Sequence, residues 1–470
     1  MQALKLANRR EFLRLTAAGA VGAALLAACQ PAAAPTPTPA PKPVEKPTEK
    51  PAAAPEAKPA AGAQAQITLR MHSRTGTEGT KPEASIKVLM ERNPKVAIKL
   101  ETFPDAEYYN KILALTAGGQ LGDCLFGTIR NYHLTSQSGL YFDCLPLAQA
   151  KKYDTTQFLK AAMDYLLQED GKLWALPYKA HPGCPAIYYN KQMFEKAGVP
   201  VPAPKTYAEL AEIAVKMTKD TTGTGKIDQW GLLPHTEAEN MVTSIIRAWG
   251  VEPVDQVFRA TKSLIDQPKQ VEAFTWIWEL YHKHKVAPLP GPGTQGYQQI
   301  FIAGQAAMRQ ASSSTKGDMA AIGDKFMMRN VLMPPGPGGV VGTQLNFDNF
   351  GVYAKTKYPE EAFDVVGYFC GKEHGIRLGL PEGGGSWTCG ARKDVFYSEE
   401  LLKDPNHKIF ADIIEKSAPM WYAANYRMDE YWTALQQGID KIILNPTQPT
   451  VADFRGLKET LQNVLDKPKP

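Results

Sequence analysis

Apolar and polar residues alternate from residue 67 to residue 71 (ITLRM), which predicts a β-strand. The pattern then changes to helical spacing, and the apolar residues of 81–91 fall on one face of the predicted helix. Further along, the same two periods predict a strand, a helix and a short buried strand over 96–102, 108–117 and 124–127. Strands that alternate with helices predict an α/β body with a largely parallel sheet.

Ligands of such sheets bind beyond the carboxyl ends of the strands. Three segments of this sequence follow predicted strands directly, namely 72–79, 128–132 and the residues after Leu176. We therefore expect a binding site that is built mainly from these segments.

Residues 1–28 have the pattern of an export signal. Basic residues come first, and the apolar run 17–28 that follows is shorter than the roughly 20 residues that a membrane span needs. The arginine pair at 9–10 resembles a twin-arginine signal, and LAAC at 26–29 resembles a bacterial lipobox. This resemblance implies that Cys29 is lipidated and that the protein is anchored to the membrane outside the cytoplasm. The alternative is an ordinary cleavage site with an incidental cysteine.

A segment rich in proline and alanine follows Cys29 and continues to residue 65. It has almost no large apolar side chains, so nothing offsets the entropy that would be lost if it were ordered. We predict a disordered, extended linker that holds a folded body away from the membrane.

The body, residues 66–470, is too long for one hydrophobic core, so two lobes are expected. The whole chain has a formal charge of +5, and most of this excess lies in the first 65 residues. A nearly neutral body argues against nucleic acid as a partner. No apolar run in the body is long enough to span a membrane.

Five of the six cysteines lie in the body, where an extracytoplasmic location would allow disulfide bonds. Cys124 with Cys144 and Cys370 with Cys389 are the nearest pairs in sequence, and Cys184 is the candidate for the odd thiol, but the pairing stays open. No cysteine or histidine pair has zinc-site spacing, so no metal and no cofactor are expected.

A specific resemblance begins at residues 188–218, YYNKQMFEKAGVPVPAPKTYAELAEIAVKMT. This segment resembles the signature stretch of family 1 extracellular solute-binding proteins, the carbohydrate-type receptors of bacterial ABC importers. Thr206 and Glu209 within it have the spacing of a helix capping box. Other segments resemble the family in the same order along the chain, namely 171–178, 219–231, 301–308 and 349–379.

The resemblance implies a type II periplasmic-binding-protein fold, in which two α/β lobes are joined by two or three crossing segments. Lobe 1 would contain residues 66–180 and 347–398, and lobe 2 would contain 181–346 and 399–470. The implied function is that of a monomeric receptor that binds a sugar or oligosaccharide between the lobes and delivers it to an ABC permease. A second interpretation is a lipid-anchored hydrolase that acts on carbohydrate, although the sequence contains no catalytic motif that we can identify.

Candidate binding residues include aromatic side chains, because a flat ring stacks on the apolar face of a sugar. Four aromatic residues lie near predicted loop or strand ends: Tyr132, Tyr178, Trp387 and Trp421. Core packing is the alternative role for each of them.

Two arginines, Arg74 and Arg130, lie in segments that should face the cleft. A guanidinium group binds carboxylate, phosphate or several hydroxyls, so this pair favours an acidic sugar or another small anion. The alternative is a pair of solvated surface charges. Further polar candidates occupy loop or hinge positions: His72, His181, Ser313, Asn346 and Asp348.

The loop at 219–231 loosely resembles a calcium loop. It carries too few carboxylates for an EF-hand, so the sequence leaves calcium binding there open.

Overall fold

The computed structural model describes residues 67–75, 82–167, 171–256, 260–291, 296–381, 387–419 and 427–468. All of them belong to one compact unit, Ala61–Pro470. The predicted export signal, Cys29, the linker and Trp421 lie outside the described residues. No helix among the described residues is both long enough and apolar enough to cross a bilayer.

The larger sheet has the strand order β10-β4-β9-β3-β1-β2, and β11 pairs with β9 beside this path. Its strands are β1 (Ile67–Thr75), β2 (Val96–Pro104), β3 (Cys124–Thr128), β4 (Leu176–Gly183), β9 (Gln344–Val352), β10 (Cys389–Gly390) and β11 (Ala418–Pro419). The predicted alternation of strand and helix is confirmed over β1, β2 and β3, which pair in parallel.

The prediction of a largely parallel sheet is wrong, although β11 also pairs in parallel with β9. β9 runs antiparallel to both β3 and β4, and β10 runs antiparallel to β4. The physical reason is the path of the chain, because β9 re-enters the sheet at the end where β4 leaves it, with Gln344 opposite Gly183.

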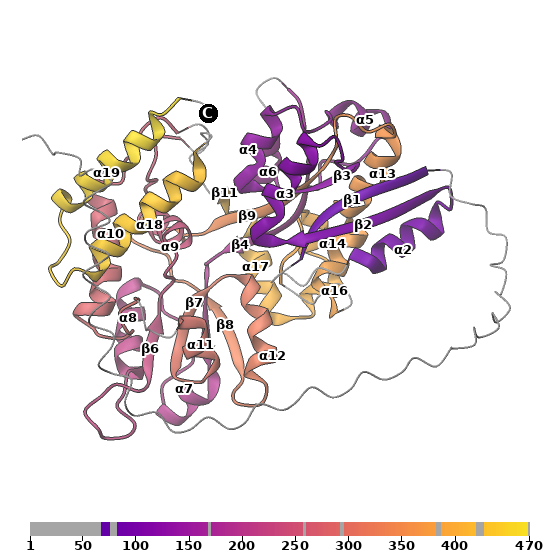
Figure 1. The fold of residues 1–470 in the computed structure, drawn as a ribbon. Coiled ribbons are helices and arrows are strands. Elements are labelled where there is room, and N and C mark those ends of the chain that lie inside the picture. The colour runs from indigo at the N-terminus through magenta and orange to yellow at the C-terminus, as the bar shows by residue number, and fades with distance from the viewer. Residues whose placement is uncertain are drawn as a thin grey trace, which may run out of the picture. The chain divides into compact units, whose positions relative to one another are not determined.

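The smaller sheet has the order β6-β7-β5-β8. Its strands are β5 (Ala186–Asn190), β6 (Trp230–Leu233), β7 (Ala306–Ala311) and β8 (Met328–Leu332). β5 begins shortly after β4 ends, so the chain crosses there from the larger sheet to the smaller one (Figure 1). It returns between β8 and β9, and two C-terminal helices follow β11 along the chain.

The helices occur in the following order along the chain, with the 3₁₀ helix η1 between α11 and α12. They are α2 (Pro82–Arg92), α3 (Asp105–Ala117), α4 (Ile129–Gln137), α5 (Leu145–Ala150), α6 (Lys160–Leu166), α7 (Lys191–Ala197), α8 (Tyr207–Met217), α9 (Ala238–Ala248), α10 (Pro268–His282), α11 (Tyr297–Ile302), η1 (Ser313–Gly317), α12 (Asp318–Ile322), α13 (Pro359–Phe369), α14 (Lys372–Gly379), α15 (Lys393–Phe396), α16 (Glu399–Leu402), α17 (Pro405–Ile414), α18 (Met428–Leu444) and α19 (Val451–Leu465).

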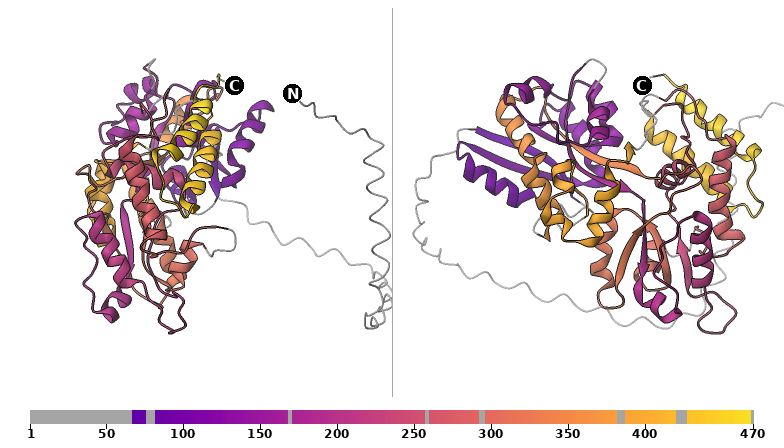
Figure 2. Two further views of the ribbon diagram at one scale, coloured as in Figure 1. Left: turned by 90° about the vertical axis from the view of Figure 1, so that its left-hand side faces the viewer. Right: turned by 180° about the vertical axis from the view of Figure 1, so that it is seen from behind.

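Each sheet has its own set of helices. α2 and α3 pack on β2, whereas α8 packs on β6 and α11 on β7 (Figures 1 and 2). α17 contacts β4 of the larger sheet and β8 of the smaller one. The two sheets with their helices form the two-lobed α/β fold that the sequence predicts, while the exact residue boundaries of the lobes stay a prediction.

Polar side chains and a glycine cap the helices that follow β5. The side chain of Asn190 caps α7 by accepting a hydrogen bond from the backbone N–H of Met193 at 3.1 Å. Gly198 ends that helix with φ of +64°, a conformation that glycine adopts without strain. Thr206 then caps α8 by accepting from the N–H of Glu209 at 3.1 Å. The predicted capping box of α8 is formed only in part, because the carboxylate of Glu209 accepts from the N–H of Lys205 at 2.8 Å rather than from that of Thr206.

Buried polar bonds tie the crossing segments together where they meet. Arg247 of α9 donates from Nη1 to the carbonyl oxygens of Thr343, at 3.3 Å, and Ala418, at 3.0 Å. The hydroxyl oxygens of Thr343 and Ser417 lie 3.2 Å apart. One helix of the smaller lobe thus holds the start of β9 and the start of β11.

The five cysteines of the body are buried and form no disulfide bonds with one another. The pairs that are nearest in sequence, Cys124 with Cys144 and Cys370 with Cys389, are therefore not bonded in this structure. Burial disfavours the charged thiolate. It raises the pKa of Cys144 to about 12 and also raises the pKa of Cys124, Cys370 and Cys389, so these four thiols are weak nucleophiles.

Candidate functional site

A polar cavity of about 600 Å³ lies where elements of both lobes meet. β1, β3 and β4 reach it with their carboxyl ends and β9 with its first half, as expected for ligand sites of α/β sheets. Helices α3, α4, α9 and α18 supply the other walls. The lining residues are Arg74, Tyr108, Tyr109, Asn110, Phe126, Thr128, Ile129, Arg130, Asn131, Lys179, His181, Glu237, Asn240, Asn346, Phe347, Asp348, Thr388 and Asp429.

Five of the predicted binding residues therefore meet at one cavity. They come from distant parts of the chain, and they are Arg74, Arg130, His181, Asn346 and Asp348. The structure brings them together because β9 lies between β3 and β4 in the sheet.

The ion pairs of the cavity floor centre on Asp348. Its Oδ2 lies 3.3 Å from Nη2 of Arg74 and 3.4 Å from Nζ of Lys179. The guanidinium of Arg74 also stacks on the ring of Phe126, 4.8 Å from the ring centroid. These contacts hold two cationic side chains in fixed positions at the floor of the cavity.

Burial changes the protonation of two floor residues. Desolvation lowers the pKa of Lys179 to about 8, although the negative charge of Asp348 acts in the opposite direction. Desolvation also lowers the pKa of His181 to about 4, so this imidazole is neutral at physiological pH. His181 thus offers hydrogen-bonding nitrogens rather than a charge.

The opposite wall is more acidic and is linked to the crossing segments. Asn240 donates from Nδ2 to Oε2 of Glu237 at 2.8 Å, and it accepts on Oδ1 from the side-chain amide of Gln344 at the start of β9. Arg130 of α4 and Asp429 of α18 form an ion pair of 3.8 Å between exposed side chains. The cavity therefore combines carboxylates, amides, hydroxyls and cations, which is typical of a site for a small polar molecule.

Two predicted binding residues in the larger lobe lie in its core instead. The imidazole of His72 is fully buried, and its Nε2 accepts the N–H of Gly122 at 2.8 Å. Tyr132 is 1% exposed and donates its hydroxyl to the carbonyl of Leu166 at 2.6 Å. Neither residue is among those that line the cavity.

Three more candidates pack between elements rather than in the cavity. Tyr178 points into the aromatic core, and its hydroxyl lies 3.1 Å from Nε2 of His374. Trp387 is 2% exposed and stacks on Tyr188, with ring centroids 5.8 Å apart. Ser313 is fully buried and approaches the cavity only through Thr388, whose hydroxyl oxygen lies 3.4 Å from its own. We assign all three to packing, which was the alternative role for the two aromatic residues.

Five of the lining residues that sequence reasoning missed are direct neighbours of residues that it named: Ile129, Asn131, Lys179, Phe347 and Thr388. Lys179 follows Tyr178, and successive side chains of a strand point to opposite faces of the sheet. His181 and the residue two positions before it, Lys179, lie on the same face of the strand. A site that includes His181 should therefore include Lys179 rather than Tyr178. Tyr109, Asn110 and Glu237 gave no comparable signal, because they lie on a predicted helix or ahead of a helix start.

The loop at 219–231 satisfies its own carboxylates. Asp220 accepts from the N–H of Gly225 at 2.6 Å, and Asp228 accepts from Thr221 through both its backbone N–H and its hydroxyl at 2.8 Å. Among the described residues, no group of three or more histidine, cysteine, aspartate or glutamate side chains is arranged to hold a metal ion.

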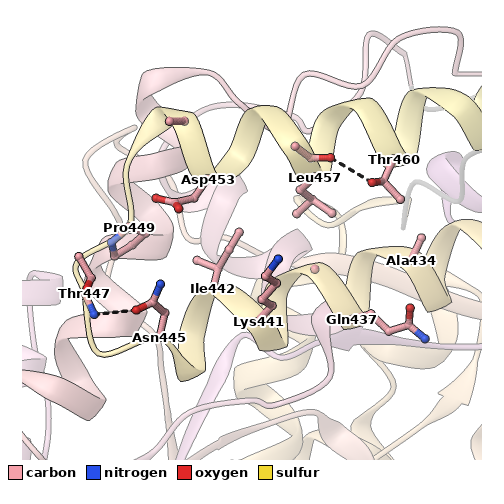
Figure 3. A pocket seen from close by; sticks show the side chains of 13 residues that line it. Ala434, Gln437, Lys441, Ile442, Asn445, Thr447, Pro449, Asp453, Leu457 and Thr460 are labelled. Atoms are coloured by element: carbon pink, nitrogen blue, oxygen red, sulfur yellow. Dashed lines mark hydrogen bonds between the residues drawn. The ribbon is translucent and has the colours of Figure 1, made fainter. Parts of the chain in front are cut away.

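A second cavity, of about 540 Å³, lies between α18 and α19 (Figure 3). Its lining includes Lys441 and Ile442 from α18 and Asp453 and Leu457 from α19. None of the predicted binding residues lines it. The polar cavity between the lobes is therefore the candidate functional site.

Comparison with known proteins identifies the family of the chain. A family model described as bacterial extracellular solute-binding protein matches residues 84–408, which is more than half of the chain. The chain belongs to this family. The resemblance seen in the sequence of this solute-binding protein is thereby confirmed.

Curated relatives match this solute-binding protein over part of its length. The sn-glycerol-3-phosphate-binding periplasmic protein of Rhizobium meliloti is 31% identical over 176 residues, which are 37% of this chain and 40% of the relative. The arabinooligosaccharide-binding protein of Halalkalibacterium halodurans is 26% identical over 223 residues, 46% of this chain and 47% of the relative. The chain thus spans less than half the length of the relatives that it matches.

Solved structures of solute-binding proteins have the same fold. An ABC substrate-binding protein of Listeria monocytogenes, in complex with cycloalternan, has a TM-score of 0.70 at 18% identity and covers 85% of this chain and 98% of its own. UgpB of Mycobacterium tuberculosis, in complex with glycerophosphocholine, has a TM-score of 0.69 at 18% identity, with coverages of 85% and 98%. The predicted type II two-lobed fold is confirmed.

Proposed function

We propose that this protein is the substrate receptor of an ABC importer and that it binds a small polar solute in the cavity between its lobes. The observation that carries the proposal is the cavity itself, because elements of both lobes line it and its lining is polar. A ligand that contacts both lobes favours the closed form, which is the form that a permease can distinguish from the empty receptor.

The solute class follows from the lining and from the relatives. Carboxylates, amides and hydroxyls suit the hydroxyl groups of a sugar or oligosaccharide, and Arg74, Arg130 and Lys179 suit an acidic group. Relatives of this chain are named for sn-glycerol 3-phosphate and for arabino-oligosaccharides. We propose a sugar-like solute, with an acidic sugar or a sugar phosphate as the variant that the cations favour.

The location of the receptor is proposed from its sequence. Residues 1–28 would direct export, Cys29 would carry the lipid, and the linker to residue 65 would leave the body free to reach the permease. We expect the receptor to act as a monomer. A hydrolase gains no support from the family, whose members are described as solute-binding proteins.

A thermal-shift screen with four probes tests the proposal: maltose, arabinotriose, glucuronate and sn-glycerol 3-phosphate. A ligand that binds only the folded state adds about 2.7 kcal/mol to the free energy of unfolding at 100 times its Kd, so the midpoint of unfolding must rise with concentration. Chromatography of each probe after incubation measures turnover. Failure of all four probes to shift the midpoint, or consumption of a probe by the protein, would contradict the proposal.

A further inference from the structure

Two side-chain oxygens belong to residues that line the cavity, but the oxygens themselves are buried in its wall and lack hydrogen-bond partners among the described residues. They are Oδ1 of Asn346, on β9, and the hydroxyl of Tyr109, on α3. A buried polar atom without a partner destabilises a fold, because folding removes its bond to water and supplies nothing in return. When such unpaired atoms occur at a functional site, their presence needs a functional explanation.

Asn346 is held in place by the sheet. It lies two residues before Asp348, so both side chains leave β9 on the same face, and it is directly opposite His181 on β4. Oδ1 of an amide is only an acceptor, so the missing partner must be a donor.

Tyr109 is on the neighbouring wall and is fixed differently. The preceding residue, Tyr108, anchors α3 by donating its hydroxyl to the carbonyl of Phe126 at 2.9 Å. Burial, together with the negative charge of Asp429, raises the pKa of Tyr109 to about 12, so its hydroxyl keeps its proton. The hydroxyl of Tyr109 can therefore donate a hydrogen bond to a ligand hydroxyl or accept one from it.

We propose that Asn346 and Tyr109 determine specificity: without a solute these two oxygens stay buried and unpaired in the cavity wall, and binding turns the two side chains so that hydroxyl groups of the solute bond to them. The inference rests on the receptor function proposed above and names the chemical groups of the solute that the site recognises. A solute that lacks either hydroxyl leaves a buried oxygen unpaired and is rejected, as in other sites built to bind a hydroxyl.

The proposal predicts that substitution of either residue raises the thermal stability of the full-length protein and lowers its affinity for the solute. Asn346→Leu and Tyr109→Phe each remove an unpaired buried oxygen, so the midpoint of thermal unfolding without ligand should rise by about 1–4 °C. The same variants lose a ligand contact, so the affinity for the probe that binds best should fall about 10-fold or more. If instead the two side chains stabilise the fold through bonds of their own, both variants would lower the midpoint.

Tyr207→Phe is the matched control. The hydroxyl of Tyr207 is also buried without a partner among the described residues, but its ring packs on Trp249 and Trp276 and does not line the cavity. Removal of this hydroxyl should raise the unfolding midpoint and leave the affinity unchanged.

Deoxy analogues of the best-binding probe supply the ligand side of the test. The analogue that lacks the contacted hydroxyl should bind the wild type about 10-fold more weakly than the parent probe, and should bind the matching variant as well as the parent does. Unchanged affinity in both variants, or a midpoint that falls in both, would overturn the inference. If no probe binds the wild type, the proposed function fails for these solutes. The unfolding midpoints without ligand still show whether the two unpaired oxygens destabilise the folded protein.

Discussion

The Nζ atom of Lys179 lies 3.4 Å from Oδ2 of Asp348, and the side chain of this lysine is only 3% exposed. Burial of the ammonium group lowers the pKa of Lys179 to about 8, from 10.5. Between these two values the unfolded chain binds a proton that the folded protein does not bind. The free energy of unfolding therefore rises with pH across this window, and the cost of burying the charge is present in full below pH 8.

Lys179→Met should remove this dependence. From pH 7.5 to pH 10.5, the free energy of unfolding of the wild type should gain about 3 kcal/mol relative to the variant, which is the pKa difference expressed as energy. Urea unfolding at a series of pH values measures it, and Lys416→Met, at an exposed lysine, should show no relative change. A constant difference between wild type and Lys179→Met across the window would contradict the prediction.

The same strand shows how far the sequence could predict the site. The resemblance implied that lobe 1 ends near residue 180, and in the structure β4 leads from the larger sheet toward the smaller one. The resemblance could not show that β4 continues to Gly183, nor that its register with β9 shifts between Pro177 and Ala180. Without the strand length, the alternation of faces cannot be assigned, so Tyr178 was chosen where Lys179 faces the cavity.

The first strand carries a similar lesson. The pattern predicted a strand that ends at Met71, with His72 and Arg74 in a loop, but β1 continues to Thr75. Polar residues at the end of a strand look like a loop in the sequence alone. The segments that pair with them and cover them in the sheet are distant in sequence, so no local pattern marks the strand. Fixed in the strand, Arg74 reaches the cavity while His72, two residues earlier, is covered by the segment at Gly122.

Gly183 is predicted to be necessary at the first crossing between the lobes. A Cβ atom at this position would overlap Cγ and Nε2 of Gln344, the side chain that donates to Asn240 at the cavity wall. Gly183→Ala should therefore lower the free energy of unfolding by about 1–3 kcal/mol, as other overpacked substitutions do. Urea unfolding measures the loss.

A double-mutant cycle with Gln344→Ala tests the cause, because it removes the overlapping atoms. Gly183→Ala should cost at least about 1 kcal/mol less in the Gln344→Ala background than alone. Gly456→Ala is the control, since a Cβ there meets no atom within 4 Å and alanine favours the helix α19, so the protein should become slightly more stable. Additive effects at Gly183 and Gln344 would rule out the overlap as the cause.

The two arginines predicted from sequence give the most direct test of the charge of the solute. Arg74 and Arg130 reach the cavity from β1 and α4, and each guanidinium group can add a charge-assisted hydrogen bond worth about 1.5–3 kcal/mol to an anion. Arg74→Ala with Arg130→Ala should weaken glucuronate binding about 100-fold or more, but the binding of its uncharged isostere, glucuronamide, by about 10-fold or less. Isothermal titration calorimetry measures both ligands, with Arg455→Ala on exposed α19 as the control. Equal losses for the two ligands would mean that the arginines shape the cavity without selecting charge, and a neutral sugar would then be the better candidate for the solute.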